Sequence, residues 1–360
     1  MSPKGVVWPL EPHTRGKHEV LRHYLGAWFP ILGFTQGRIV FIDGFAGPGQ
    51  YAGGEEGSPL IALQVLRQHS AKFEAEVKFG FIEKDRERAD HLQKLIDGVK
   101  PSLPASCEVD VLPGAFDETM TSVLDELDAQ GKQLAPAFVM VDPFGVSDTP
   151  MAVIKRILRG DKTEVYVSFM YRDINRFKAT PEFERPLTDL FGTDEWRKGI
   201  DLEGEAKKDF FYGLYESQLR KAGANNVLHF DLYEANQLVY AIFFATRHWL
   251  GADRMKRAIW RVAPFGDFAF RGTRLKQLTL GLDVDCRPLR KALQDRFKGK
   301  GWVTIEQVAE FVGSDQTDFH TGQLKKPVLV PMEKEKFIEV DPKTRKKERT
   351  FPDRTKLRFL

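Results

Sequence analysis

The sequence predicts an α/β fold in which a mostly parallel sheet is covered by helices on both faces. Short apolar runs alternate five times with segments of helical periodicity, and these runs give the expected strands. They lie at residues 39–42, 77–83, 107–112, 137–141 and 164–170. Two later apolar runs, at 227–232 and 238–246, are joined by a short polar turn. Because this turn is too short for a parallel crossover, we expect an antiparallel hairpin there.

A parallel sheet that finishes in an antiparallel hairpin is typical of class I methyltransferases, whose sheet is Rossmann-like. We therefore expect a domain of this kind over residues 1–275, beginning with a helix at 17–32 that has one apolar face. From 171 to about 209 the alternation of strand and helix lapses, and the residues are charged and aromatic. This insertion is either a substrate lid or a helical excursion.

The remainder of the chain, residues 282–360, is predicted to be a separate module that follows a polar, glycine-containing connector at about 264–281. Three short helices and then a hairpin are expected there, which is the order of a winged helix. The stretch from Asp341 to Leu360 holds eight Lys or Arg against three acids. The hairpin either contacts the phosphates of a nucleic acid, docks a protein, or is simply solvated.

Composition indicates a soluble globular protein, with 42% hydrophobic and 29% charged residues. The net charge of +3 does not indicate or exclude a nucleic-acid partner. Cys107 and Cys286 are far apart and lack metal-ligand spacing, so we expect no metal site and a reducing cytoplasm. The N-terminus lacks the apolar core of a signal peptide, and no apolar run reaches membrane-spanning length, so we expect no membrane association.

Residues 38–49, R-I-V-F-I-D-G-F-A-G-P-G, combine a buried strand, an acid and a glycine turn. Such a turn lies at the carboxyl edge of a parallel sheet, where open α/β folds bind ligands. The spacing is not G-x-G-x-x-G, and Pro48 removes an N–H that a phosphate would need, so S-adenosylmethionine fits better than a dinucleotide. The alternative is a tight turn with an Asp cap. The predicted cofactor residues of this loop are Asp43, Gly44, Phe45, Ala46, Gly47 and Gly49.

Further cofactor contacts are predicted at the ends of the next two strands. Glu83 is placed to accept the ribose hydroxyls, or else it is a carboxylate favoured by the dipole of the following helix. Phe116 is a candidate to stack on adenine and Asp117 to receive its amino group, although a core Phe and an N-cap Asp explain these residues equally well. Lys17, on the first helix, is a candidate partner of the cofactor carboxylate.

The catalytic candidates Asp142, Pro143 and Phe144 follow the fourth predicted strand, across the topological switch point from the glycine loop. A known use of such a motif is to hold an exocyclic amine. Asp142 and the carbonyl at Pro143 would accept the amine hydrogens while Phe144 stacks on the base. Catalysis would then come from positioning and a suitably polar site. The alternative is that Asp-Pro begins an ordinary turn.

Five segments of the chain form a recognisable set: K-H-E-x-L-R-x-Y-L-x-A-W, F-I-D-G-F-A-G-P-G, V-D-P-F-G, F-A-T-R-H-W-L-G and F-P-D-R-T-K-L-R-F. In these segments the chain resembles the bacterial three-Cys-motif partner family, TcmP. The resemblance implies a class I methyltransferase-like fold and a partner, a radical-SAM-like protein with a three-cysteine motif. A more distant likeness is to ribosomal RNA adenine methyltransferases, whose D-P-P-Y motif differs from this chain at Phe144 and Gly145.

The leading hypothesis is an S-adenosylmethionine-dependent methyltransferase that acts on an exocyclic amine of a nucleic acid. The second is a non-catalytic accessory subunit that binds the same cofactor and serves the three-Cys-motif partner. Metal-dependent phosphodiester chemistry is disfavoured because clustered carboxylates are not evident near one loop.

Overall fold

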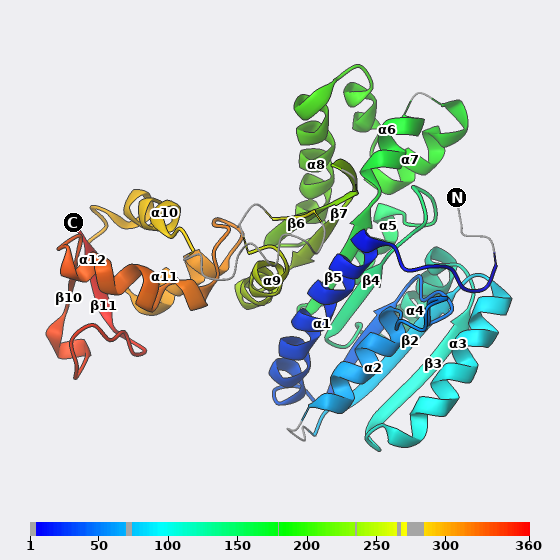
Figure 1. Cartoon of the computed structure of the whole chain (residues 1–360), viewed down its shortest axis with the longest axis horizontal. Helices are drawn as coiled ribbons and strands as arrows, with labels where there is room; N and C mark the ends of the chain where they lie inside the picture. Colours follow the sequence, from blue (N-terminus) through cyan, green and yellow to red (C-terminus); the bar gives the residue numbers. More distant parts are fainter. Residues whose placement is uncertain (1–4, 70–73, 179, 235, 265–267, 272–283) are drawn as a thin grey trace.

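The computed structural model describes residues 5–69, 74–178, 180–234, 236–264, 268–271 and 284–360 (Figure 1). Its main feature is an eight-stranded sheet in the order β3-β2-β1-β4-β5-β7-β6-β8. The strands are β1 (Arg38–Asp43), β2 (Glu76–Glu83), β3 (Cys107–Pro113), β4 (Ala137–Val141), β5 (Thr163–Phe169), β6 (Asn226–Glu234), β7 (Gln237–Thr246) and β8 (Ala269–Phe270).

The first five strands are parallel, and β7 runs antiparallel to both β5 and β6. This arrangement confirms the predicted sheet with its terminal hairpin, and its strand order is that of class I methyltransferases. The short strand β8 was not predicted. It lies within the expected connector at 264–281 and pairs parallel with β6; residues 265–267 and 272–281 of that connector lie outside the described part of the chain.

Helices cover both faces of the sheet because its central strands are apolar on both sides. In β1, Phe41 faces one core and the next residue, Ile42, faces the other, as the two-residue period of a strand requires. The first face is covered by α1 (Pro12–Gly33), α2 (Ser58–Gln68), α3 (Arg86–Val99) and α9 (Trp249–Val262). The second is covered by α4 (Phe116–Ala129), α5 (Met151–Ile157), α7 (Glu184–Phe191) and α8 (Gly204–Lys221).

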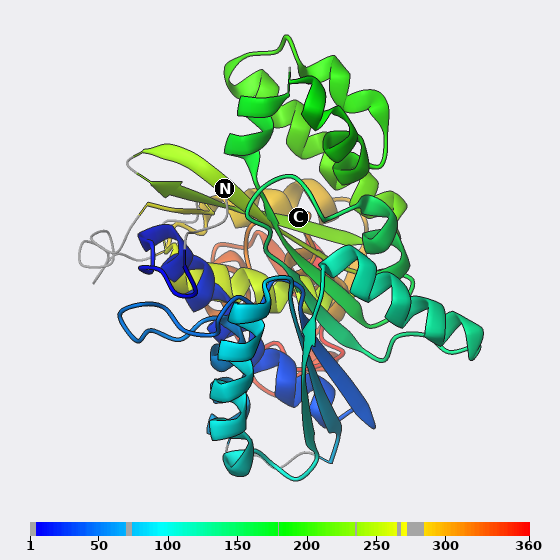
Figure 2. The ribbon, with the colours of Figure 1, turned by 90° about the vertical axis from the view of Figure 1, so that its right-hand side faces the viewer.

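The insertion at 171–209 is helical, and it projects beyond the sheet in Figure 2. It contains α6 (Tyr171–Phe177), α7, two short 3-10 turns and the start of α8. Residues of α6 also line the cavities described below, so the segment is both a helical excursion and a wall of the site.

The C-terminal residues form their own hydrophobic core beside α9, as Figure 1 shows. Their elements are α10 (Arg287–Phe297), β9 (Trp302–Thr304), α11 (Ile305–Gly313), α12 (Val330–Lys334), β10 (Ile338–Val340) and β11 (Lys356–Phe359). Strands β10 and β11 form the expected antiparallel hairpin, and β9 pairs with β11 on its other side. The third expected helix is broken into a 3-10 turn, a π-helical turn and α12, and it contains Pro327 and Pro331, which lack an N–H donor.

A buried lysine joins the two cores. Lys256 of α9 is fully buried, and its Nζ donates hydrogen bonds to the carbonyls of Val312, Ser314 and Thr317 at 2.5, 2.5 and 2.8 Å. The C-terminal residues are therefore attached to the sheet domain by polar contacts as well as by packing. None of the helices in the described ranges has the length and hydropathy needed to cross a bilayer.

Candidate functional site

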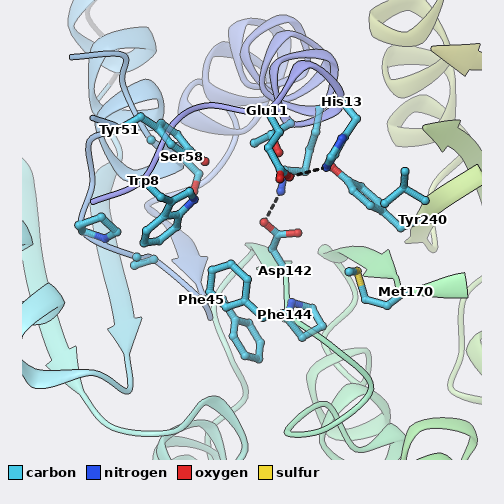
Figure 3. A pocket seen from close by; sticks show the side chains of 18 of the residues that line it. Trp8, Glu11, His13, Phe45, Tyr51, Ser58, Asp142, Phe144, Met170 and Tyr240 are labelled. Atoms are coloured by element: carbon cyan, nitrogen blue, oxygen red, sulfur yellow. Dashed lines mark hydrogen bonds and ion pairs between the residues drawn. The ribbon is translucent and has the colours of Figure 1, made fainter. Parts of the chain in front are cut away.

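Two adjoining cavities lie where β1, β2 and β4 end, and most of the residues lining the smaller one are drawn in Figure 3. The smaller has a volume of about 350 Å³ and the larger about 580 Å³. Both are lined by Phe45, Pro143, Phe144 and Asp173. The glycine loop and the D-P-F-G turn, predicted from separate parts of the sequence, therefore form the boundary between the two cavities.

Asp43 ends β1 beneath the glycine loop and is completely buried. Its Oδ1 accepts a hydrogen bond from the N–H of Phe45 at 3.2 Å, whereas Oδ2 has no hydrogen-bond partner among the described residues. Burial raises the pKa of Asp43 to about 6, although the Phe45 N–H and the nearby Ser58 hydroxyl favour the charged form. A buried carboxylate oxygen without a partner is costly. Asp43 itself lines neither cavity and lies behind the loop that does.

The loop after Asp43 needs its glycines. A Cβ on Gly44 would lie 2.3 Å from the ring of Phe116, so any larger residue would displace that ring. Gly47 and Gly49 have φ values of 62° and 80°, which residues with a side chain rarely adopt. The bare backbone thus lines the smaller cavity closely, as a cofactor loop requires.

Glu83 ends β2 and fixes the same loop. Its Oε2 accepts a hydrogen bond from the N–H of Gly47 and its Oε1 from the N–H of Asp85, both at 2.8 Å. Glu83 is buried and lines the larger cavity, and this burial raises the pKa of its carboxyl group. Each carboxylate oxygen keeps a second lone pair, so Glu83 can still accept hydroxyl donors. Its predicted ribose contact is compatible with this position and stays a prediction.

The neighbouring residues Phe116 and Asp117 line different cavities. Phe116 lines the larger cavity, but it is 1% exposed and packs against Phe45 with ring centroids 5.6 Å apart. Asp117 lines neither cavity; it faces a neighbouring hollow that Pro150 and Arg185 also line. Of the two predicted adenine contacts, only Phe116 is therefore positioned beside the other candidates.

Asp142 and Lys17 are brought together although they were predicted for different roles. Lys17 comes from α1, is 4% exposed, and donates from Nζ to Oδ2 of Asp142, a contact drawn at Asp142 in Figure 3. Burial acts to raise the pKa of Asp142, but the charge of Lys17 and its hydrogen bond outweigh this, so the pKa lies below its ordinary value. Asp142 is therefore a carboxylate whose charge is neutralised by Lys17.

Several lining residues were missed from the sequence. Trp8 precedes α1, and its ring contacts those of Phe144 and Tyr51 edge-on, at 5.6 and 6.0 Å between centroids. Tyr240 comes from β7, and the Nζ of Lys17 lies 5.6 Å from the centre of its ring. Nothing in the local pattern around Trp8 or Tyr240 marks them as site residues, because only the folded chain brings them to the cavity.

A metal centre finds no support in the part of the chain that the structure describes, where no three His, Cys, Asp or Glu side chains converge as ligands.

Comparison with known proteins gives structural likeness only. No protein-family model and no curated protein matches the sequence, so the resemblance to the TcmP family gains no support there. The chain is similar to an O-methyltransferase from Bacillus cereus in complex with SAH, with 11% identity over 62% of this chain and 80% of that one, at a TM-score of 0.35. It is also similar to the putative methyltransferase yhhF from Escherichia coli, with 16% identity over 63% and 86% of the two chains and a TM-score of 0.31. A third similar structure is the METTL16 MTase domain, with 12% identity over 63% and 66% and a TM-score of 0.33.

Proposed function

We propose that the chain is a class I S-adenosylmethionine-dependent methyltransferase. The observation that carries this proposal is that the glycine loop and Glu83 line two adjoining cavities at one edge of a sheet with the methyltransferase strand order. Asp43 lies directly beneath that loop, at the end of β1. The negative charge of Asp43 beneath the loop and the loop geometry of Gly44, Gly47 and Gly49 fit a cofactor that is cationic and carries no phosphate.

Four of the predicted residues have a role that their position allows. Glu83 would accept the ribose hydroxyls at the larger cavity, and Phe116 would border the base. Asp43 would support the glycine loop from below and place a negative charge near the cationic cofactor. When bound, S-adenosylmethionine supplies an electrophilic methyl group on a positively charged sulfur. Phe144, which is 37% exposed and borders both cavities, would separate the cofactor from the methyl acceptor.

A nucleic acid is the proposed acceptor, and the C-terminal residues support it. Their helices and three-stranded sheet follow one another in the order of a winged helix. In the connection between β10 and β11, Arg345 is paired with Glu333, whereas several exposed cations have no carboxylate partner among the described residues. These cations are Lys343, Lys346, Lys347 and Arg349. Such a cluster is suited to phosphate contacts without reading of bases.

The hypothesis of an exocyclic amine acceptor requires free oxygen acceptors at Asp142. Lys17 occupies one of them, which favours either a different acceptor atom or the accessory role that the TcmP resemblance implies. The three-Cys-motif partner stays a prediction. The acceptor atom is taken up below.

Isothermal titration with S-adenosylhomocysteine tests the cofactor proposal. We expect wild-type protein to bind with a micromolar Kd and Glu83→Ala to bind at least about tenfold more weakly, because a buried carboxylate that accepts ligand hydroxyls is lost. Glu87→Ala is the matched control, since Glu87 is an exposed acid on the adjacent helix α3. Absence of binding heat at millimolar ligand, with folded protein, would refute the proposal.

A further inference from the structure

The contact between Lys17 and Asp142 defines the chemistry available to a methyl acceptor. Both side chains line the smaller cavity, next to the glycine loop and to Phe144. The side chain of Asp142 is 24% exposed, while that of Lys17 is 5% exposed. A molecule that enters this cavity therefore meets an ammonium group and a carboxylate as one unit.

An amine is poorly matched to this unit. An exocyclic amine presents N–H donors and needs oxygen acceptors, but a lysine ammonium offers three donors and no acceptor. Lys17 also takes up Oδ2 of Asp142. A hydroxyl group is well matched, because its oxygen accepts a hydrogen bond from Lys17 while its proton points to the remaining acceptor capacity of Asp142.

We propose that Lys17 and Asp142 bind and activate a hydroxyl oxygen, so that the methyl group is transferred to oxygen; this rests on the proposed function. The acceptor oxygen forms a bond to the methyl carbon while the carbon–sulfur bond breaks. The electron pair of that bond stays on sulfur, and the hydroxyl proton leaves to water in the open cavity. The ammonium of Lys17 stabilises the negative charge that develops on the acceptor oxygen.

Together with the proposed nucleic-acid acceptor, this chemistry selects RNA. Within a nucleic-acid chain the ribose 2′-hydroxyl is the internal hydroxyl group, and DNA lacks it. The inference is therefore that the chain methylates a ribose 2′-oxygen.

The rim of the smaller cavity has features that suit a single RNA strand. Arg172 and Arg176 of α6 are exposed and line this cavity, where they can contact phosphates. Trp8 and Phe144 lie at the same cavity and contact each other edge-on. Cations interleaved with aromatic rings are the usual way of holding unpaired nucleotides.

The first experiment locates the methyl group. Wild-type protein is incubated with S-adenosylmethionine carrying a labelled methyl group and with total cellular RNA, or with DNA as the second arm. The RNA is then hydrolysed in alkali, which cannot cleave next to a 2′-O-methyl ribose. We expect label in alkali-resistant dinucleotides and none in DNA. Label in mononucleotides would mean base methylation and would overturn the inference, as would the absence of label in RNA. The binding of S-adenosylhomocysteine tests the cofactor proposal separately.

The second experiment separates two roles of Lys17. If Lys17 serves the acceptor, Lys17→Met should lower methyl transfer by about 100-fold or more while the Kd of S-adenosylhomocysteine stays within about threefold of wild type. If Lys17 holds the cofactor carboxylate, that Kd should rise at least about tenfold, and the inference fails.

Two further variants keep this result interpretable. Arg15→Met removes an exposed cation of α1 that lines neither cavity, and it should change neither quantity. Lys17→Arg keeps the positive charge beside Asp142, and it should retain more transfer than Lys17→Met at a comparable melting temperature. Equal losses in Lys17→Arg and Lys17→Met, with both proteins folded and both binding S-adenosylhomocysteine, would contradict stabilisation by charge.

Discussion

Asp43→Asn should stabilise the cofactor-free protein above neutral pH, because Asp43 is ionised there at a cost. Burial raises its pKa from 3.8 to about 6. One pKa unit corresponds to about 1.4 kcal/mol, so the folded state loses up to about 3 kcal/mol when this carboxyl ionises. The pKa of Asp43 is higher in the folded state than in the unfolded state. The contribution of Asp43 to the free energy of unfolding is therefore fully present below about pH 4 and is lost as the pH rises through about 6.

Asn has nearly the same shape as Asp and carries no charge, so the variant should not show this loss. We expect Asp43→Asn and wild type to have similar free energies of unfolding at pH 4. At pH 8 the variant should be more stable by up to about 3 kcal/mol. Urea unfolding, followed by circular dichroism at each pH, measures the difference. Asp90→Asn, at an exposed position of α3, is the matched control and should show no such trend.

The same substitution should weaken the binding of the cofactor. Asp43 Oδ2 has no partner among the described residues, and the charge that destabilises the fold is the charge that would attract a cationic donor. We expect the Kd of S-adenosylhomocysteine at pH 8 to rise about tenfold or more in Asp43→Asn. A variant that is less stable than wild type at pH 8, or a stability difference that does not depend on pH, would refute this account of Asp43.

Three further predictions concern packing, attachment and nucleic-acid binding. Gly44→Ala should lower the free energy of unfolding by about 1–3 kcal/mol, because its Cβ would lie 2.3 Å from the Phe116 ring; urea unfolding measures this. Lys256→Met leaves three buried carbonyls without their donor and should cost about 3 kcal/mol or more, with earlier proteolytic release of the C-terminal residues. Lys346→Glu with Lys347→Glu should weaken RNA binding and flatten its dependence on salt, measured by fluorescence anisotropy; an unchanged slope would remove these lysines from the interface.

The parts of the site that could be predicted from the sequence are those that local pattern determines. Asp43, Glu83 and Asp142 each follow an apolar run, and the parallel arrangement of the strands puts their ends at one edge. Gly44 could be identified as a turn residue, but its close contact with Phe116 depends on a distant segment.

The other parts depend on contacts between segments far apart in the chain. Lys17 and Asp142 are 125 residues apart, and no pattern in either segment indicates that they pair. Trp8 precedes the first helix, and only the fold turns it onto Phe144. By contrast, the third helix of the C-terminal module, expected at 320–332, could be predicted to be shortened or broken from the sequence alone, because Pro327 and Pro331 lie within it.

The two aspartates of the site, Asp43 and Asp142, differ in their charge environment. Asp43 forms no ion pair among the described residues, and its negative charge lowers the stability of the fold above neutral pH. Asp142 is neutralised by Lys17, so its end of the site offers a paired donor and acceptor and little net charge. A positively charged cofactor is attracted to the first aspartate, and a neutral hydroxyl is suited to the second. If Asp142 had no cationic partner, its carboxylate would compete with that of Asp43 for the positively charged cofactor. The ion pair with Lys17 prevents this competition. It also gives a reason for the buried lysine on α1, a helix that otherwise packs on the sheet through apolar residues.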